Sequence, residues 1–136
     1  MTRYMLDTNM IIYLIKQKPQ SVMQHILMLA NDEQLIMSFV SYAELLKGVE
    51  RSSKKEQALT NLEQVVKQIE VVYPTHANIC HYYAQHFERL KQMGTPIGMN
   101  DLWIACHALA EQAILVTHNV REFNRITDLK VENWVE

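Results

Sequence analysis

Short apolar segments alternate with longer amphipathic segments along the chain, and this alternation limits the possible folds more than any single motif does. Strands are expected at Arg3–Leu6, Gln34–Phe39, Ile69–Tyr73 and Ala113–Thr117, with a further strand at Leu129–Glu132. Helices are expected over 10–16, 21–31, 41–49, 53–68, 75–94 and 101–112. Strands that alternate with helices predict an α/β fold, in which helices cover both faces of a mainly parallel sheet of four to five strands.

Polar side chains stand at the expected starts of several helices, where they can accept hydrogen bonds from free backbone N–H groups. The expected caps are Ser21, Ser41, Thr75 and Asn100, together with a capping box that begins at Ser53.

The 136 residues suffice for one domain, and we expect a single domain over 1–136 because no linker or repeat divides the chain. The 13 Lys and Arg against 15 Asp and Glu give a formal net charge of −2, which excludes a strongly basic nucleic-acid-binding protein. No segment is long and apolar enough to span a bilayer, and the two cysteines form no zinc or disulfide pattern. We therefore expect a cytoplasmic protein with no membrane partner.

Three carboxylates occupy similar places relative to the expected strands and helices. Asp7 directly follows the first strand, Glu44 lies in the first turn after the second strand, and Asp101 begins the helix before the fourth strand. Functional groups of parallel α/β proteins gather beyond the carboxyl ends of the strands. Asp7 and Glu44 are therefore expected at one edge of the sheet, whereas the loop before Asp101 leaves its position less constrained.

Each carboxylate also has a purely structural explanation. Asp7 can cap the following helix, and Asp101 can stabilise the positive end of a helix dipole. Glu44 can complete a capping box with Ser41. These structural explanations are weaker for the three residues taken together than for each one alone, because converging carboxylates repel each other and raise each other's pKa. A hard cation such as Mg²⁺ or Mn²⁺ removes that repulsion and prefers oxygen ligands.

Four stretches of the chain are characteristic when taken together. They are MLDTN (5–9), SYAELLKG (41–48), PIGMNDLWIACHAL (96–109) and LVTHNVREFNRITDLKVENW (115–134). In this order they resemble PIN-domain ribonucleases, and more narrowly the VapC toxins of VapBC toxin–antitoxin pairs. The resemblance covers essentially the whole chain. It implies a PIN-like α/β/α sandwich and a Mg²⁺- or Mn²⁺-dependent endoribonuclease that inhibits translation by cutting RNA, with tRNA, and initiator tRNA in particular, as the expected target.

The resemblance also implies residue roles. Asp7, Glu44 and Asp101 carry over as the catalytic and metal-binding residues. In the resulting hypothesis, water attacks the scissile phosphorus with a carboxylate as proton acceptor and leaves 5′-phosphate and 3′-hydroxyl ends.

The chain departs from the family pattern at one position. Many PIN domains carry a further acidic residue directly after the threonine of the fourth-strand motif, whereas His118 and Asn119 follow Thr117 here. Glu122 is the nearest acidic replacement, so the number of bound ions stays open. The expected secondary shell comprises Asn9, Thr117, Asn119 and Glu122, with turn formation and capping as the structural alternatives.

Basic residues near these positions are candidates for RNA contacts. Lys47 and Arg51 follow Glu44, and Arg121 follows Asn119, although such charges are also typical of a solvated surface. The resemblance further implies a VapB-type antitoxin as partner, a homodimer, a toxin–antitoxin hetero-oligomer, and promoter DNA bound through the antitoxin.

Two other functions are compatible with parts of the pattern. Haloacid-dehalogenase-like phosphatases, which are metal-dependent, also carry an Asp after the first strand, but their second acidic residue is replaced here by Asn9. A non-catalytic module that binds nucleic acid or protein would use the carboxylates only as caps. Dependence on a divalent cation distinguishes the enzyme from that module.

Overall fold

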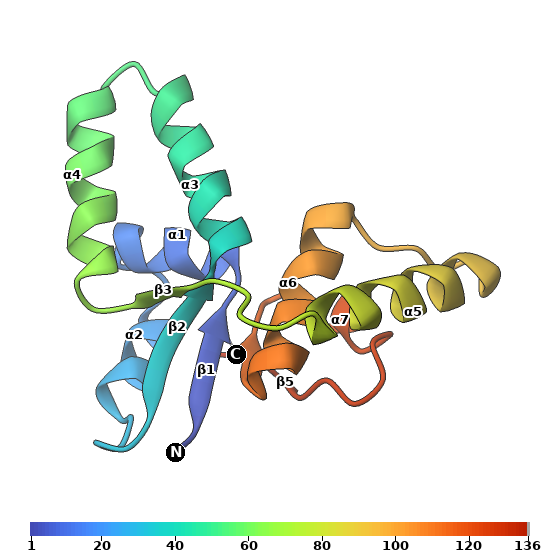
Figure 1. Cartoon of the computed structure of the whole chain (residues 1–136). Helices are drawn as coiled ribbons and strands as arrows, with labels where there is room; N and C mark the ends of the chain where they lie inside the picture. Colours follow the sequence, from blue (N-terminus) through green and yellow to red (C-terminus); the bar gives the residue numbers. More distant parts are fainter. Residues whose placement is uncertain (136) are drawn as a thin grey trace.

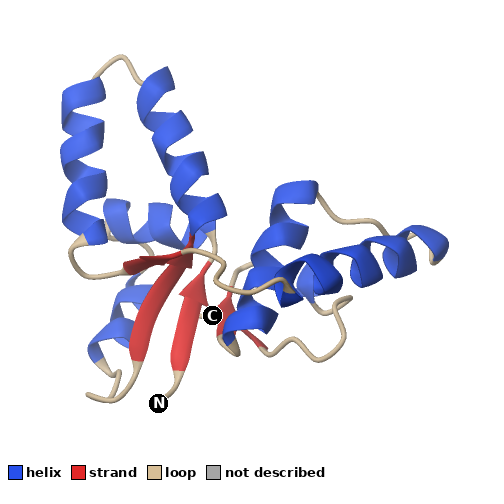
Figure 2. Cartoon of the chain, in the orientation of Figure 1, coloured by secondary structure: helices blue, strands red, loops and turns tan. Residues whose placement is uncertain are grey.

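β1 (Arg3–Leu6) is the central strand of a five-stranded sheet in the computed structural model, which describes residues 1–135. The strand order is β3-β2-β1-β4-β5, and each neighbouring pair is parallel. The other strands are β2 (Gln34–Ser38), β3 (Glu70–Val72), β4 (Ile114–Val116) and β5 (Val131–Glu132). The predicted α/β fold with a parallel sheet is confirmed, and it has all five of the expected strands (Figure 2).

The helices in this part of the chain join the strands and cover the sheet. They are α1 (Thr8–Lys16), α2 (Gln20–Leu27), α3 (Phe39–Arg51), α4 (Lys55–Val66), α5 (Asn78–Gln92), α6 (Met99–Glu111) and α7 (Val120–Phe123). In Figure 1, α3 and α4 form a hairpin that rises beyond the carboxyl ends of the strands, while α5 extends on the other side. None of these helices combines the length and the hydropathy that crossing a membrane would need.

Each face of the sheet packs into its own apolar core. Met5 belongs to the core covered by α5, α6 and α7, whereas the next residue, Leu6, belongs to the core covered by α1, α2, α3 and α4. The same alternation separates Ile36 from Met37 in β2. Since successive side chains of a strand point to opposite faces, the sheet is buried on both sides and the predicted α/β/α sandwich is confirmed.

The start of α3 differs from the prediction in a way that bears on Glu44. Ser38 caps this helix, because its Oγ accepts a hydrogen bond from the backbone N–H of Val40 at 3.2 Å. The strand β2 runs into α3 without a loop, so the helix begins three residues earlier than the position of Ser41 suggests. Ser41 lies inside α3, and the capping box expected between Ser41 and Glu44 is wrong.

The other predicted serine, threonine and asparagine caps are also wrong. Ser21 lies inside α2 and donates its hydroxyl hydrogen to the carbonyl of Val135 at 2.7 Å. The helices α4, α5 and α6 begin without a side-chain cap, so Ser53, Thr75 and Asn100 do not have the predicted role. Tertiary packing, rather than local capping preference, determines where these helices begin.

Candidate active site

Asp7 lies where β1 ends and α1 begins, and both elements fix its position. Its backbone N–H donates to the carbonyl of Val116 in β4 at 3.1 Å, and its carboxylate caps α1 by accepting from the N–H of Met10 at 3.0 Å. Burial raises the pKa of this carboxyl group, although hydrogen bonds from Thr117 and Met10 act in the opposite direction. The predicted cap is confirmed, and it presents a buried carboxylate at the carboxyl edge of the sheet.

Asp101 lies in the first turn of α6, within range of the charges of three other carboxylates. Burial is the largest cause that raises its pKa to about 6, followed by the negative charges of Asp7, Glu122 and Glu44. The loop before α6 therefore brings Asp101 to the same edge of the sheet as Asp7. We call Asp7, Glu44, Asp101 and Glu122 the carboxylate cluster.

Glu44 extends from α3 towards the first turn of α1. Its Oε1 atom accepts a hydrogen bond from the Thr8 hydroxyl at 2.6 Å, a length typical of a bond to a charged carboxylate. The negative charge of Glu44 contributes to the raised pKa of both Asp7 and Asp101. Its carboxylate is thus engaged at the site and not at the start of its own helix.

The segment after β4 supplies the fourth member of the cluster. The Asn119 backbone N–H donates to Thr117 Oγ1 at 3.0 Å, and the Asn119 side-chain amide donates to the Glu122 carboxylate. Glu122 in turn helps to raise the pKa of Asp101. Neither His118 nor Asn119 after Thr117 is acidic, and Glu122, one turn of helix further along, contributes the negative charge of this segment.

The donor set of the cluster fits a hard divalent cation. The ion pairs in residues 1–135 involve Glu50 and Glu111, so the described contacts provide no lysine or arginine partner for the cluster. No three acidic, histidine or cysteine side chains in these residues lie close enough together to hold one ion as they stand. Mg²⁺ commonly binds only one or two protein carboxylates and retains several waters, which Asp7 and Asp101 can satisfy.

Comparison with known proteins places the chain in a family. Residues 4–129 match the PIN domain family model. The chain is 47% identical over 133 residues to Ribonuclease VapC1 of Haemophilus influenzae, with 98% of both chains covered. The chain belongs to the VapC family of PIN domains.

Two further comparisons extend this PIN-domain assignment. The chain is 36% identical to the tRNA(fMet)-specific endonuclease VapC of Salmonella typhimurium, covering 98% of this chain and 99% of that protein. The structure of VapBC2 from Rickettsia felis bound to a promoter DNA fragment superposes with a TM-score of 0.90 at 40% identity, covering 98% and 99% of the two chains.

The sequence pattern missed two hydroxyl groups of this PIN domain. Thr8 donates to Glu44, and Ser41 Oγ lies 3.2 Å from Thr8 Oγ1. Thr8 stands inside the MLDTN stretch, and its place beside Asp7 is the only feature of the sequence that points to its contact with Glu44. Asn9, which was expected in the secondary shell, is exposed. Thr117 is fully buried, and its hydroxyl acts to lower the pKa of Asp7.

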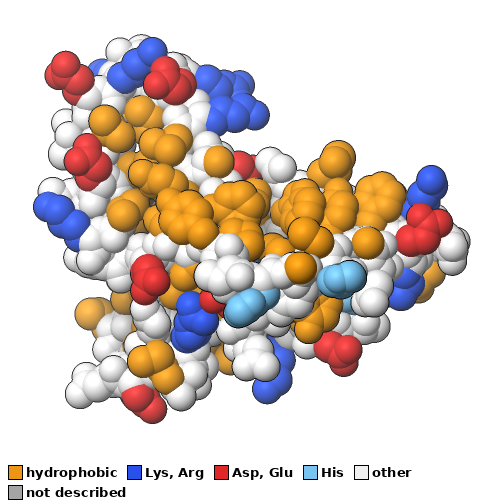
Figure 3. Space-filling view, viewed as in Figure 1, with side chains coloured by type: hydrophobic (Ala, Val, Ile, Leu, Met, Phe, Trp, Pro, Cys, Tyr) orange, Lys and Arg blue, Asp and Glu red, His pale blue; other side chains and the backbone are white. Residues whose placement is uncertain are grey.

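The basic residues expected to contact RNA are exposed on the VapC fold. Lys47 and Arg51 lie on α3, and Arg121 lies on α7. Figure 3 shows lysine and arginine side chains gathered near the tip of the α3–α4 hairpin. Their exposure is compatible with both a role in RNA binding and a solvated surface.

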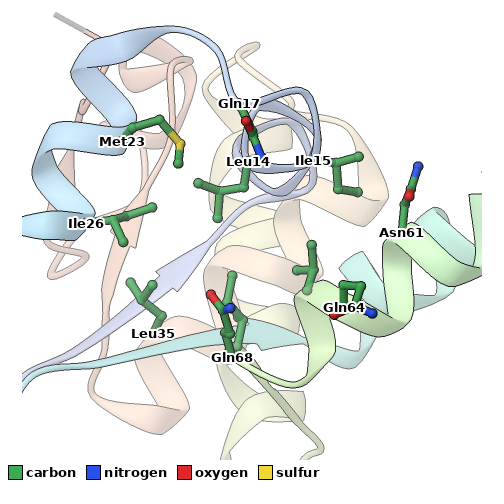
Figure 4. A pocket seen from close by; sticks show the side chains of 11 residues that line it. Leu14, Ile15, Gln17, Met23, Ile26, Leu35, Asn61, Gln64 and Gln68 are labelled. Carbon is green, nitrogen blue, oxygen red and sulfur yellow. The ribbon is translucent and has the colours of Figure 1, made fainter.

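A separate pocket of about 350 Å³ lies between α1, α2, α4 and β2 of the PIN domain. Side-chain amides of Gln17, Asn61, Gln64 and Gln68 lie on its wall, together with aliphatic side chains such as Leu14 (Figure 4). None of the carboxylate cluster lines this pocket, so the candidate active site is a different place on the molecule.

A band of hydrophobic side chains crosses the face seen in Figure 3, from the α3–α4 hairpin to α5. Phe39 and Tyr73 have ring centroids 6.3 Å apart, and Tyr83 stacks on Trp103 at 3.8 Å and on Phe87 at 5.8 Å. Tyr73 is 57% exposed and Phe87 is 40% exposed. We call these five residues the aromatic face of the PIN domain.

Proposed function

We propose that this protein is a Mg²⁺- or Mn²⁺-dependent endoribonuclease that cuts tRNA and acts as the toxin of a toxin–antitoxin pair. The observation that carries the proposal is the carboxylate cluster, in which the charges of Asp7, Glu122 and Glu44 act on Asp101. Carboxylates at the carboxyl edge of a parallel sheet supply oxygen ligands for a hard cation. The ribonuclease names of relatives that match nearly the full chain support the same reaction.

Each member of the cluster has a proposed role. Asp7 and Asp101 would hold the ion directly, and Glu44 would hold it directly or through a water. The bound ion supplies positive charge that stabilises the phosphodiester in its transition state and promotes ionisation of water. One of these carboxylates is proposed to accept a proton from the attacking water. Cleavage would leave 5′-phosphate and 3′-hydroxyl ends.

The proposed substrate is tRNA, with initiator tRNA as the first candidate. The similarity to a tRNA(fMet)-specific endonuclease supports this choice. With a net charge of −2, the chain has no general attraction for RNA, so binding would depend on local groups such as Lys47, Arg51 and Arg121. Such groups contact phosphates and position the RNA, while the shape of the groove selects it.

The proposed partners follow from the complexes that related chains form. The Rickettsia felis VapBC2 structure supports a VapB-type antitoxin and promoter DNA bound by the toxin–antitoxin hetero-oligomer. We also propose a homodimer formed through the aromatic face, since exposed aromatic clusters are typical of protein interfaces. The proposed location is the cytoplasm, where both tRNA and promoter DNA of a bacterial cell are accessible.

The direct test is cleavage of total tRNA by purified protein free of antitoxin, with Mg²⁺, with Mn²⁺ and with EDTA. We expect cutting with either ion, loss of cutting in EDTA, and loss of cutting in Asp7→Asn. Asp32→Asn is the matched control, because Asp32 is an exposed loop residue outside the cluster. Sequencing of the fragment ends identifies both the target and the cut site.

Other results would favour other functions. Intact RNA with every ion, from folded protein, would favour a non-catalytic binding module. Release of inorganic phosphate from a phosphomonoester without chain cleavage would favour a metal-dependent phosphatase. Fragments that end in a 2′,3′-cyclic phosphate would contradict the proposed attack by water.

A further inference from the structure

We infer that Thr8 is a positioning residue that fixes the Glu44 carboxylate at the candidate active site. The inference rests on the proposed function, because it explains how one member of the cluster is held for cation binding. Thr8 Oγ1 lies 2.6 Å from Glu44 Oε1 and 3.2 Å from Ser41 Oγ. The contact joins α1 to α3 across 36 positions of sequence.

The direction of these hydrogen bonds follows from the number of protons. A threonine hydroxyl donates one hydrogen and accepts others. The carboxylate of Glu44 can only accept, so the Thr8 hydrogen is directed to Glu44. Ser41 must then donate to Thr8 Oγ1, and because Ser41 is fully buried, no water competes for it. The result is a directed chain from Ser41 through Thr8 to Glu44.

Glu44 needs such a support because of its length and its neighbours. A glutamate side chain loses appreciable rotamer entropy when it is fixed, so a free one would sample several positions. The negative charges of Asp7 and Asp101 repel Glu44, which favours positions away from the site. The short bond to Thr8 opposes that repulsion.

A hydroxyl is well suited to this task because it carries no charge. Lysine or arginine at position 8 would also hold Glu44, but it would neutralise the carboxylate that a cation requires. Thr8 also directly follows Asp7 in the chain and opens α1. The same first turn of helix therefore fixes both Asp7 and Glu44, one by its capping geometry and the other by a side chain.

The test uses the full chain and Mn²⁺ as probe. Thr8→Val keeps the shape of the side chain and removes the hydroxyl, whereas Thr8→Ser keeps the hydroxyl. Loss of one hydrogen bond to a charged group predicts Mn²⁺ binding about tenfold weaker in Thr8→Val by titration calorimetry. Thr8→Ser is expected to stay within about twofold of the original protein by the same reasoning. Thr60→Val is the matched control, since Thr60 is exposed on α4 and bonds only the carbonyl of Glu56.

A second measurement on metal-free protein tests the contact itself. Thr8→Val should lower the melting temperature of the original chain by more than that of Glu44→Ala, in which only the bond from Ser41 remains to be lost. Equal effects in the two backgrounds, or equal Mn²⁺ affinity of Thr8→Val and the original protein, would overturn the inference. If the original protein binds no Mn²⁺ and cuts no RNA, the proposed function fails, and the non-additivity of the melting temperatures then decides the Thr8–Glu44 contact alone.

Discussion

The Nδ1 atom of His107 lies 2.8 Å from the Oγ atom of Ser38, so a buried side chain of α6 contacts the residue that caps α3. Ser38 Oγ accepts from the backbone N–H of Val40, which leaves its own hydrogen available for His107. Nε2 then carries the ring hydrogen and faces Glu111 Oε2 at 3.9 Å. These two helices carry Asp101 and Glu44, so the bond between them helps to set the spacing of the carboxylate cluster.

His107→Ala should destabilise the protein by about 2–4 kcal/mol, because it leaves a cavity and removes the partner of a buried hydroxyl. Urea unfolding measures this loss. His81→Ala is the matched control on exposed surface of α5 and should change the free energy of unfolding by less than about 0.5 kcal/mol. Similar losses in the two variants would show that the contact with Ser38 contributes little.

The same histidine predicts a pH dependence. Burial lowers the pKa of His107 in the fold, with Arg3 acting in the same direction and Glu111 in the opposite one. The fold therefore favours neutral imidazole, and its stabilising effect is lost as pH falls below the ordinary histidine value of about 6.5. The stability difference between the original chain and His107→Ala should narrow as pH falls below about 6.5. A constant difference would exclude this linkage.

Asp101→Asn should abolish RNA cleavage and yet stabilise the metal-free protein at pH 7.5. The pKa of Asp101 is raised to about 6, so its charged form opposes folding. Allowing for solvent screening, we expect a gain of roughly 1 kcal/mol. The gain should shrink as pH falls from about 6 towards the ordinary aspartate value of about 3.9, because protonation of Asp101 then relieves the original chain as well. Thermal melts at several pH values, without added metal, measure both effects.

Glu122→Gln should lower the pKa of Asp101 from its value of about 6 towards the ordinary range, since the charge of Glu122 is one of the causes that raise it. Carboxyl carbon NMR of metal-free protein reports this pKa directly. Glu56→Gln, a change of an exposed residue in α4, is the control. An unchanged Asp101 titration in Glu122→Gln would place Glu122 outside the cluster.

Phe87→Glu should convert the proposed homodimer to a monomer in light scattering with size-exclusion chromatography. It places a charge within the aromatic face, where burial without a partner is costly. Leu27→Glu is the control, because Leu27 is 82% exposed on α2, away from this face. A monomeric original chain, or a dimer that persists in Phe87→Glu, would exclude this interface.

The sheet and its helices could be predicted from the sequence because both depend on the period of apolar residues. The positions of Asp7 and Glu44 followed from the carboxyl ends of β1 and β2. The convergence of Asp101 could not be predicted, because a loop rather than a strand leads into α6. The Thr8–Glu44 bond was hidden for a similar reason, since contacts across 36 residues leave no local pattern.

The first residue of each helix was predicted less well than the presence of the helix itself. Ser41 resembled a cap by its spacing to Glu44, but β2 passes directly into α3 and Ser38 takes that role. Competition between several nearby hydroxyl groups is decided by the packing of the whole sheet. A sequence pattern reports only the local capping preference of each hydroxyl group.

The strand order β3-β2-β1-β4-β5 has a consequence for how the protein arises on the ribosome. The central strand is made first, but one of its two neighbours, β4, lies more than a hundred residues later, beyond Asp101. A nascent chain that has emerged only as far as α5 contains Asp7, Glu44 and β2, but it lacks Asp101 and β4. The carboxylate cluster can therefore assemble only after α6 and β4 have left the ribosome.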